Sequence, residues 1–233
     1  MPNVLKALKE PPEVVPVMRL MREEVYERIR AEILSCVLRP GSQVQEGDLA
    51  ARYGVSKSPI RDALLRLQEQ QLLEVLPRKG YRVKPVSIIE VREMYEMRHI
   101  LERSCVSRIV EHASDADLLT LDQFRHMPAN VSLESWIAHN RQFHTSLADI
   151  CGNSRLAGIT REIIAQFDRL IFVQMEHEQP EAGHFQEFVK EHAAIVDALQ
   201  RRDKRLVVAL VKDHVESSQH MLLKQIGSPA VIP

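Results

Sequence analysis

The chain has 233 residues, of which 45% are hydrophobic and 27% charged, the balance of a folded protein with one or two domains. Its 31 Lys and Arg nearly cancel its 32 Asp and Glu, which excludes a uniformly basic coat and an acidic disordered chain. An aromatic content of 5% and only 8 glycines favour helices over an all-β sandwich.

The cysteine spacing and the hydropathy of the sequence indicate the cellular compartment in which the protein is expected. Cys36, Cys105 and Cys151 lie far apart and form no C-x-x-C pair, so neither a redox pair nor a zinc knuckle is predicted. The amino terminus lacks a long apolar segment, and the most apolar later stretch, Leu206–Val211, is too short to cross a bilayer. We therefore expect a cytoplasmic protein with reduced cysteines and no membrane segment.

Charge is distributed unevenly along the chain. Residues 1–86 carry 15 Lys and Arg against 11 Asp and Glu, a net charge of +4, whereas residues 87–233 carry 16 against 21, a net charge of −5. All 10 histidines lie in the second part. We predict two domains with different partners, 18–86 and 87–226, between a proline-rich arm at 1–17 and a tail at 227–233.

Residues 18–86 have the element order of a winged helix-turn-helix. Apolar residues at helical spacing predict helices over 18–38, over 46–53, and from 56 or 58 to about 71. Gly54 ends the second helix, because glycine readily takes the left-handed conformation, and Ser56 or Ser58 caps the third. Short β-branched or aromatic runs on either side of Pro77 and Gly80 then predict a β-hairpin, the wing.

Beyond Val86 the sequence shows only helical patterns. The predicted helices cover 88–112, 115–126, 132–151, 154–177, 184–201 and 203–226. Six helices without strands imply a bundle. The predicted fold class is therefore mainly α, an N-terminal winged helix-turn-helix with a small β-hairpin wing followed by an all-α six-helix bundle.

The third helix and the wing are basic. Residues 56–84 carry seven basic side chains against three acidic ones. An α-helix fits the major groove of DNA, where its first residues reach the base edges, and Arg61 can donate two hydrogen bonds to a guanine. A charged face is more often merely solvated, but turn, cap, helix spacing and hairpin agree here. The candidate DNA-contact residues are Ser56, Lys57, Ser58, Arg61, Arg66, Lys79 and Gly80.

Histidines on three predicted helices point toward the inside of the bundle. Asn140 and His144 are four residues apart and share a face, His192 falls in an apolar stripe from Phe185 to Leu199, and His214 in another from Leu206 to Met221. A single such histidine is more often a core residue, but three buried imidazoles all need partners. Neutral imidazoles are good ligands for divalent metals, of which zinc and nickel are the first candidates. The candidate metal ligands are Asn140, His144, His192 and His214.

Arg98 and Glu102 lie on one inward stripe with i, i+4 spacing. They form either a structural ion pair or a site where Arg98 binds the carboxylate of a small effector. Glu191 and Asp213, which directly precede their histidines, are expected to face solvent.

Two groups of motifs resemble a known family. Arg39-Pro40-Gly41, the run Gly54–Leu64 and Lys79-Gly80-Tyr81 resemble the DNA-binding domain of GntR-type bacterial regulators. The motifs of the second half resemble FCD, the all-helical ligand-binding domain of the FadR subfamily; they are Arg98–Glu102, Asn140–His144, Cys151–Asn153, Glu191-His192 and Asp213-His214.

The resemblance implies roles for the candidate residues and includes two departures. It implies base and phosphate contacts at the start of the third helix and at the wing, and a divalent metal held by an acid and three histidines. Gly47 stands where an arginine is common, so operator preference is expected to differ. Asn140 stands where the acid is usual, and a neutral amide oxygen is the weaker metal ligand.

We therefore expect a ligand-responsive transcriptional regulator, a repressor and not an enzyme. Two chains are expected to form a homodimer that reads an inverted repeat in double-stranded DNA and responds to a small carboxylate. One alternative is a metal-dependent enzyme, which would need a general acid or base that no motif such as H-E-x-x-H supplies. The other is a sensor in which the histidines bind the ligand without metal.

Overall fold

The computed structural model describes residues 17–128, 131–175 and 184–226, so nearly all of the predicted arm and the whole predicted tail lie outside the described residues. The chain divides into two compact units. The first comprises the residues up to Ala31 together with Ser42–Val83, and the second comprises Glu32–Gly41 together with the residues from Lys84 onward. The connecting segments 32–41 and 84–86, which the sequence analysis assigns to the first domain, thus pack with the second unit.

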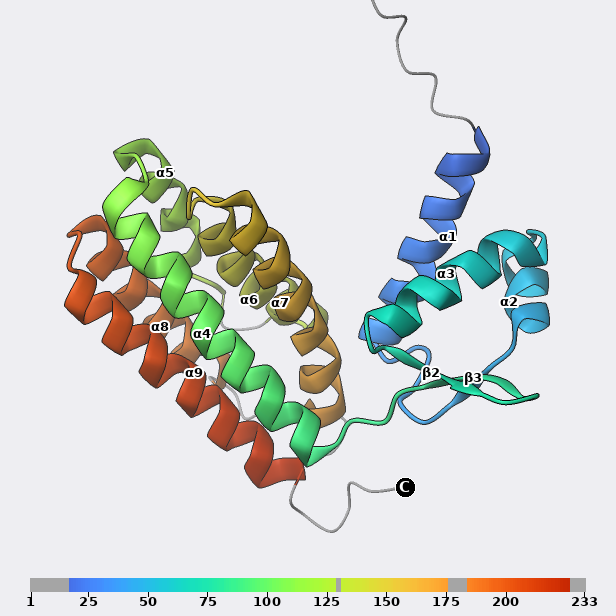
Figure 1. Ribbon diagram of the computed structural model, residues 1–233. Helices are drawn as coiled ribbons and strands as arrows, with labels where there is room; N and C mark the ends of the chain where they lie inside the picture. Colours follow the sequence, from blue (N-terminus) through green and yellow to red (C-terminus); the bar gives the residue numbers. More distant parts are fainter. Residues whose placement is uncertain (1–16, 129–130, 176–183, 227–233) are drawn as a thin grey trace, which may run out of the picture. The chain divides into compact units, whose positions relative to one another are not determined.

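The first unit has the helix-turn-helix order that the sequence predicts. Its elements are α1 (Val17–Leu34), β1 (Gln43–Val44), α2 (Glu46–Tyr53), α3 (Lys57–Glu69), β2 (Leu73–Leu76) and β3 (Gly80–Val83) (Figure 1). Ile29, Ile60 and Leu64, at helical spacing on their helices, are fully buried and join α1 to α3 in one core. The first helix ends four residues before the predicted Leu38, and Cys36 takes a left-handed φ of 57° just after it.

The wing is part of a three-stranded antiparallel sheet in the order β1-β3-β2, not an isolated hairpin. Sequence periodicity missed β1 because two residues are too few to show a repeat. Gly80 begins β3 with a φ of +89°, and a Cβ there would lie 2.7 Å from the backbone oxygen of Val44 in β1. Glycine is therefore required at this position for the wing to pair with β1.

Within its described residues the second unit is a bundle of six α-helices, which confirms the predicted fold class. They are α4 (Ile88–His112), α5 (Asp115–Leu119), α6 (Leu133–Asp149), α7 (Ser154–Met175), α8 (His184–Gln200) and α9 (Lys204–Ile226). The predicted helix 115–126 is divided, because after Leu119 the chain tightens into the 3₁₀ helix η1 (Thr120–Phe124). Serine side chains cap the starts of three helices, Ser87 before α4, Ser114 before α5 and Ser132 before α6.

Helix α4 lies at the centre of the packing, against α9 on one side and α7 on the other (Figure 1). On α9 the inward face differs from the stripe that the sequence predicts. Leu206 is 37% exposed, whereas Val207 and Val211 are fully buried. The buried face is thus rotated by about one residue, yet His214 still lies inside it, 2% exposed.

Arg169, in the middle of α7, is fully buried. Its Nη2 donates to Glu90 Oε1 at 3.0 Å and its Nη1 donates to the backbone oxygen of Lys84 at 3.3 Å. The thiol of Cys36 donates to the backbone oxygen of Arg169 at 3.8 Å. A buried guanidinium needs such partners, and here they fix both connecting segments, 32–41 and 84–86, to α7.

Within the described residues, no helix combines the length and the apolar character that a membrane span needs.

Candidate functional site

The start of α3 is exposed and lies directly after the turn that follows α2. Gly54 closes α2 with a left-handed φ of 67°, and Ser56 is the N-cap residue of α3. The side chains of Ser56, Lys57 and Ser58 all face solvent. The Ser56 hydroxyl makes no capping hydrogen bond, so this helix start presents hydroxyls, a cation and backbone N–H groups outward.

Arg61 points from the second turn of α3 toward the first turn of α2. Its Nε and Nη2 donate to the two carboxylate oxygens of Glu46, at 3.0 and 2.8 Å. The hydrogen bond from Arg61 holds the pKa of Glu46 below its usual value. Because the Arg61 side chain is still 59% exposed, the pair orients a guanidinium that remains accessible.

Arg66 and the wing are placed differently from Arg61. Arg66 donates to Glu23 of α1 at 2.8 Å, and its guanidinium lies 3.6 Å from the centre of the Tyr26 ring. These contacts give Arg66 a structural role that joins α3 to α1, and its predicted DNA contact stays a prediction. Lys79 is exposed in the turn of the wing, whereas Gly80 is half-buried against β1.

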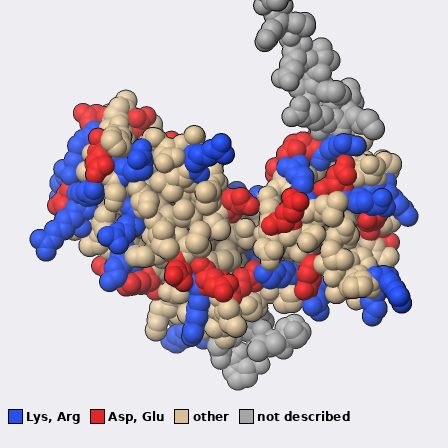
Figure 2. All heavy atoms as spheres, viewed as in Figure 1, with Lys and Arg blue, Asp and Glu red and all other residues tan. Residues whose placement is uncertain are grey.

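The surface of the first unit mixes both signs of charge. Basic and acidic side chains, blue and red in Figure 2, lie interspersed on the face shown. The ion pairs Arg61–Glu46 and Arg66–Glu23 are two examples of this mixing of charges. At Gly47 the missing side chain leaves room for Lys57, whose Nζ lies 4.0 Å from the position of a Cβ at Gly47. Lys57 of α3 thus lies beside Gly47, the position where the resembled family commonly has an arginine.

The predicted histidines converge inside the bundle. His144 of α6, His192 of α8 and His214 of α9 are all buried, and each offers one ring nitrogen within 4.8 Å of the other two. The Nε2 atoms of His144 and His214 lie 3.3 Å apart. Asn140 is also buried, and it lines the pocket next to His214. The three histidines are the side chains that could hold a divalent cation, and the predicted role of Asn140 as a fourth ligand stays a prediction.

Carboxylates orient two of the three imidazoles. Glu102 Oε2 lies 2.9 Å from Nδ1 of His144, and Glu191 Oε2 lies 2.6 Å from Nδ1 of His214. In each case the bond leaves Nε2 to face the cluster, the arrangement common behind metal-bound histidines. The expectation that Glu191 faces solvent is therefore wrong. Adjacent residues project about 100° apart around a helix, so Glu191 points away from His192 on α8 and toward α9.

His192 differs from the other two histidines in having no hydrogen-bond partner among the described residues at either ring nitrogen. Its ring stacks on Phe143, with ring centres 3.9 Å apart. Burial, aided by the nearby His214, lowers the pKa of His192 well below its ordinary value, and burial also lowers the pKa of His144 to about 3. Both rings are therefore neutral at physiological pH, the form in which a histidine binds a metal.

Arg98 brings a fixed positive charge to the same place. Its Nε donates to Glu102 Oε1 at 2.6 Å, and its Nη2 lies 2.7 Å from Nε2 of His144 and 3.5 Å from Nε2 of His214. Burial opposes ionisation of Glu102, but Arg98 and His144 hold its pKa well below the usual range. Glu102 is thus an orienting partner of Arg98 and His144, and the pocket lining includes Arg98 but not Glu102.

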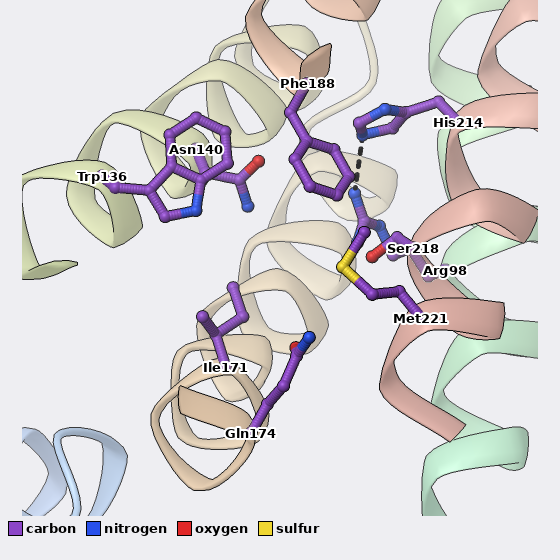
Figure 3. Close-up of a pocket in the computed structure, with 9 residues that line it drawn as sticks. All are labelled: Arg98, Trp136, Asn140, Ile171, Gln174, Phe188, His214, Ser218 and Met221. Atoms are coloured by element: carbon purple, nitrogen blue, oxygen red, sulfur yellow. Dashed lines mark hydrogen bonds between the residues drawn. The ribbon is translucent and has the colours of Figure 1, made fainter. Parts of the chain in front are cut away.

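A cavity that is open to solvent lies beside this cluster, and its empty space, counting the part open to solvent, is about 380 Å³. Figure 3 shows side chains from α4, α6, α7, α8 and α9 around it, with Arg98 and His214 on one side. The lining consists of Arg98, Trp136, Asn140, Ile171, Gln174, Phe188, His214, Ser218 and Met221.

Two family models match the chain, one for each unit. Residues 21–83 match the bacterial regulatory proteins of the gntR family, and residues 93–217 match the FCD domain. The chain belongs to the GntR family and carries an FCD domain. It is therefore a DNA-binding transcriptional regulator, as the resemblance to the FadR subfamily predicts.

Relatives are named as HTH-type transcriptional regulators, and a solved structure has the same fold. The HTH-type transcriptional repressor RspR of Escherichia coli (strain K12) is 25% identical over 201 residues, which cover 84% of this chain and 86% of RspR. The HTH-type transcriptional regulator BphR of Paraburkholderia xenovorans (strain LB400) is 28% identical over 216 residues, covering 88% and 86%. The structure of E. coli McbR/YncC has the same fold, with a TM-score of 0.73 at 20% identity, covering 88% of this chain and 98% of that one.

Proposed function

We propose that this GntR regulator is a repressor that releases its operator when a small carboxylate binds in the FCD domain. The observation that carries the proposal is the buried cluster of Arg98, His144, His192 and His214 beside the cavity. A buried guanidinium with one face toward a pocket is suited to a carboxylate, to which it can donate two parallel hydrogen bonds. Differential affinity of the acid for the released form would shift the equilibrium away from DNA.

The exposed start of α3 supports the proposed DNA contacts. Arg61 is preoriented by Glu46, and Ser56, Lys57 and Ser58 stand beside it. Arg61→Ala is expected to lower operator selectivity by at least tenfold, since one bidentate base contact contributes about 1–3 kcal/mol of discrimination. A binding selection on random DNA measures this, with Arg205→Ala in the FCD domain as the control. An unchanged sequence preference in the Arg61 variant would exclude the assignment.

We further propose that a divalent metal, zinc or nickel, takes part in effector binding. Three converging imidazoles, two of them oriented by carboxylates, support this proposal, and the two unpartnered nitrogens of His192 fit a ligand role. When bound, the cation would supply a positive charge for a carboxylate oxygen. The chain's own contribution is to hold His144 and His192 neutral and to orient Nε2 of His144 and His214 through Glu102 and Glu191.

Elemental analysis of the purified chain tests the metal proposal. The wild type is expected to contain about one zinc or nickel ion per chain, and His192→Ala combined with His214→Ala is expected to contain none. His220→Ala, an exposed position on the same helix α9, is the control and should keep the metal. A wild type that contains no metal and also takes up none in calorimetry would contradict the proposal.

One contact favours a metal-independent sensor as the second candidate. Nη2 of Arg98 already donates to Nε2 of His144 at 2.7 Å, so this hydrogen bond occupies the lone pair of Nε2 that a metal would need. In this case Arg98 alone supplies the positive charge for the acid. The acid would then bind equally well to protein treated with a chelator and to protein supplied with zinc, as measured by calorimetry.

A homodimer is the assembly we propose for reading an inverted repeat. Ile89, Met97 and Ile100 lie on one side of α4 and are 70%, 41% and 52% exposed. Large apolar side chains grouped on one face are typical of an interface. Sedimentation analysis should give a dimer for the wild type and a monomer for Met97→Glu combined with Ile100→Glu.

A further inference from the structure

The cavity beside the histidine cluster has two kinds of wall. One part is apolar and largely aromatic, formed by Trp136 of α6, Ile171 of α7, Phe188 of α8 and Met221 of α9 (Figure 3). The charge of the lining lies elsewhere, at Arg98, with the imidazole of His214 beside it. A bound acid would therefore have its carboxylate at Arg98 and its carbon framework against the surface that Trp136 and Phe188 form together, their ring centres being 5.7 Å apart.

Gln174 introduces a polar group into the apolar part. It lies on α7 one turn after Ile171, is 7% exposed, and reaches toward the cavity away from His214 (Figure 3). Its Nε2 is buried and has no hydrogen-bond partner among the described residues. An unpaired buried donor is costly, and a ligand that supplies an acceptor removes this cost.

The space available limits the ligand. The empty space of about 380 Å³ includes volume open to solvent, so at about 30 Å³ for each water-sized group a bound molecule has at most roughly a dozen heavy atoms. A ring suits this pocket because its flat face can pack on the aromatic surface that Trp136 and Phe188 form together, and a rigid ligand loses little internal freedom on binding.

We propose that the pocket selects a compact, ring-bearing monocarboxylate with a hydrogen-bond acceptor on the side away from the carboxylate, and that Gln174 donates to this acceptor. The carboxylate pairs with Arg98, the ring packs against the surface formed by Trp136 and Phe188, and Nε2 of Gln174 donates to the acceptor at the far end. The inference rests on the proposed role of this pocket as the effector site, and it makes Gln174 a specificity-determining residue.

A matched pair of acids tests the proposal. 4-Acetylbenzoate and 4-isopropylbenzoate have the same number of heavy atoms and nearly the same shape, but only the first has an acceptor opposite the carboxylate. Calorimetry with the full chain is expected to give about tenfold tighter binding of 4-acetylbenzoate, the effect of one satisfied buried donor. Gln174→Leu should remove this preference and leave the affinity for 4-isopropylbenzoate the same or higher.

Two further variants control for general effects. Gln142→Leu changes an exposed glutamine on α6 and should keep the preference for 4-acetylbenzoate. Gln174→Glu keeps the length of the side chain but cannot donate as a carboxylate, so it should lose the preference as well. Equal binding of the two acids to the wild type, binding of neither acid, or a preference that survives in both Gln174 variants would overturn the proposal.

Operator binding on the same preparations separates this inference from the proposed function. Release of DNA by both acids alike would overturn the role of Gln174 and leave the effector role standing. Selective binding of 4-acetylbenzoate without any change in the operator complex would support the pocket chemistry and contradict the effector role.

Discussion

The two units use charged side chains in opposite ways. In the DNA-binding unit the Arg61–Glu46 pair is 59% and 23% exposed at its side chains, whereas in the FCD domain the Arg98–Glu102 pair is 3% and 1% exposed. Exposed pairs contribute little to stability, so the proposed exchange of Glu46 for DNA at Arg61 would cost little. A buried pair cannot be exchanged in this way, and the FCD domain therefore presents a fixed cation to whatever enters its cavity.

The largest expected effect comes from breaking the buried pair. Glu102→Leu leaves the Arg98 guanidinium buried without a carboxylate, and we expect a loss of about 3–5 kcal/mol in the free energy of unfolding. Urea denaturation followed by circular dichroism measures this loss.

The double variant shows whether the loss comes from the unpaired charge. Arg98→Met combined with Glu102→Leu replaces the pair by apolar side chains and should recover most of the stability. A double variant as unstable as Glu102→Leu alone would mean that the contact of Glu102 with His144 determines stability, and not its pairing with Arg98.

An intermediate effect is expected at the wing. Gly80→Ala places a Cβ 2.7 Å from the backbone oxygen of Val44 at a φ of +89°, and should destabilise the first unit by about 2–3 kcal/mol. Gly54→Ala, in the same unit, is a matched control, because its φ is +67° but no atom lies within 4 Å of the added Cβ. Its cost should be only the backbone strain, about 1 kcal/mol. Equal thermal shifts for the two variants would contradict the steric argument.

The smallest effect is expected from the exposed pair. Glu46→Gln removes a negative charge beside Arg61, so affinity for any DNA should rise a few-fold while the preference for the operator falls. Fluorescence anisotropy at several salt concentrations measures both, with Glu69→Gln at the other end of α3 as control. An affinity increase confined to the operator would show that Glu46 blocks a base contact instead of orienting Arg61.

Much of the fold could be predicted because long amphipathic helices show a clear period. The predicted bounds 88–112 match α4, and those of the helices beginning at 132, 184 and 203 differ from the observed ones by at most two residues at either end. The misses follow from short or local features. β1 has only two residues, and the division of α5 from η1 depends on a change of helix type that leaves apolar spacing almost unaltered.

The candidate site could be predicted in its residue types but not in its network. Helical spacing indicated that Asn140 and His144 share a face, and apolar stripes indicated that His192 and His214 face the inside of the bundle. Nothing in the sequence indicates that Glu191 reaches His214, since that contact depends on how α8 and α9 are rotated against each other. Gln174 escaped notice for the same reason, because a glutamine in a long helix is usually exposed.

The position of Arg169 has a mechanical consequence. It anchors the backbone at Lys84, where the chain leaves the wing, to the same helix that carries Ile171 and Gln174 at the cavity. A helix is stiff along its axis, so any shift of α7 at Gln174 would also shift Arg169, which lies less than two turns away. Movement of α7 at the cavity would therefore reach the backbone at Lys84, in the segment that leads into α4.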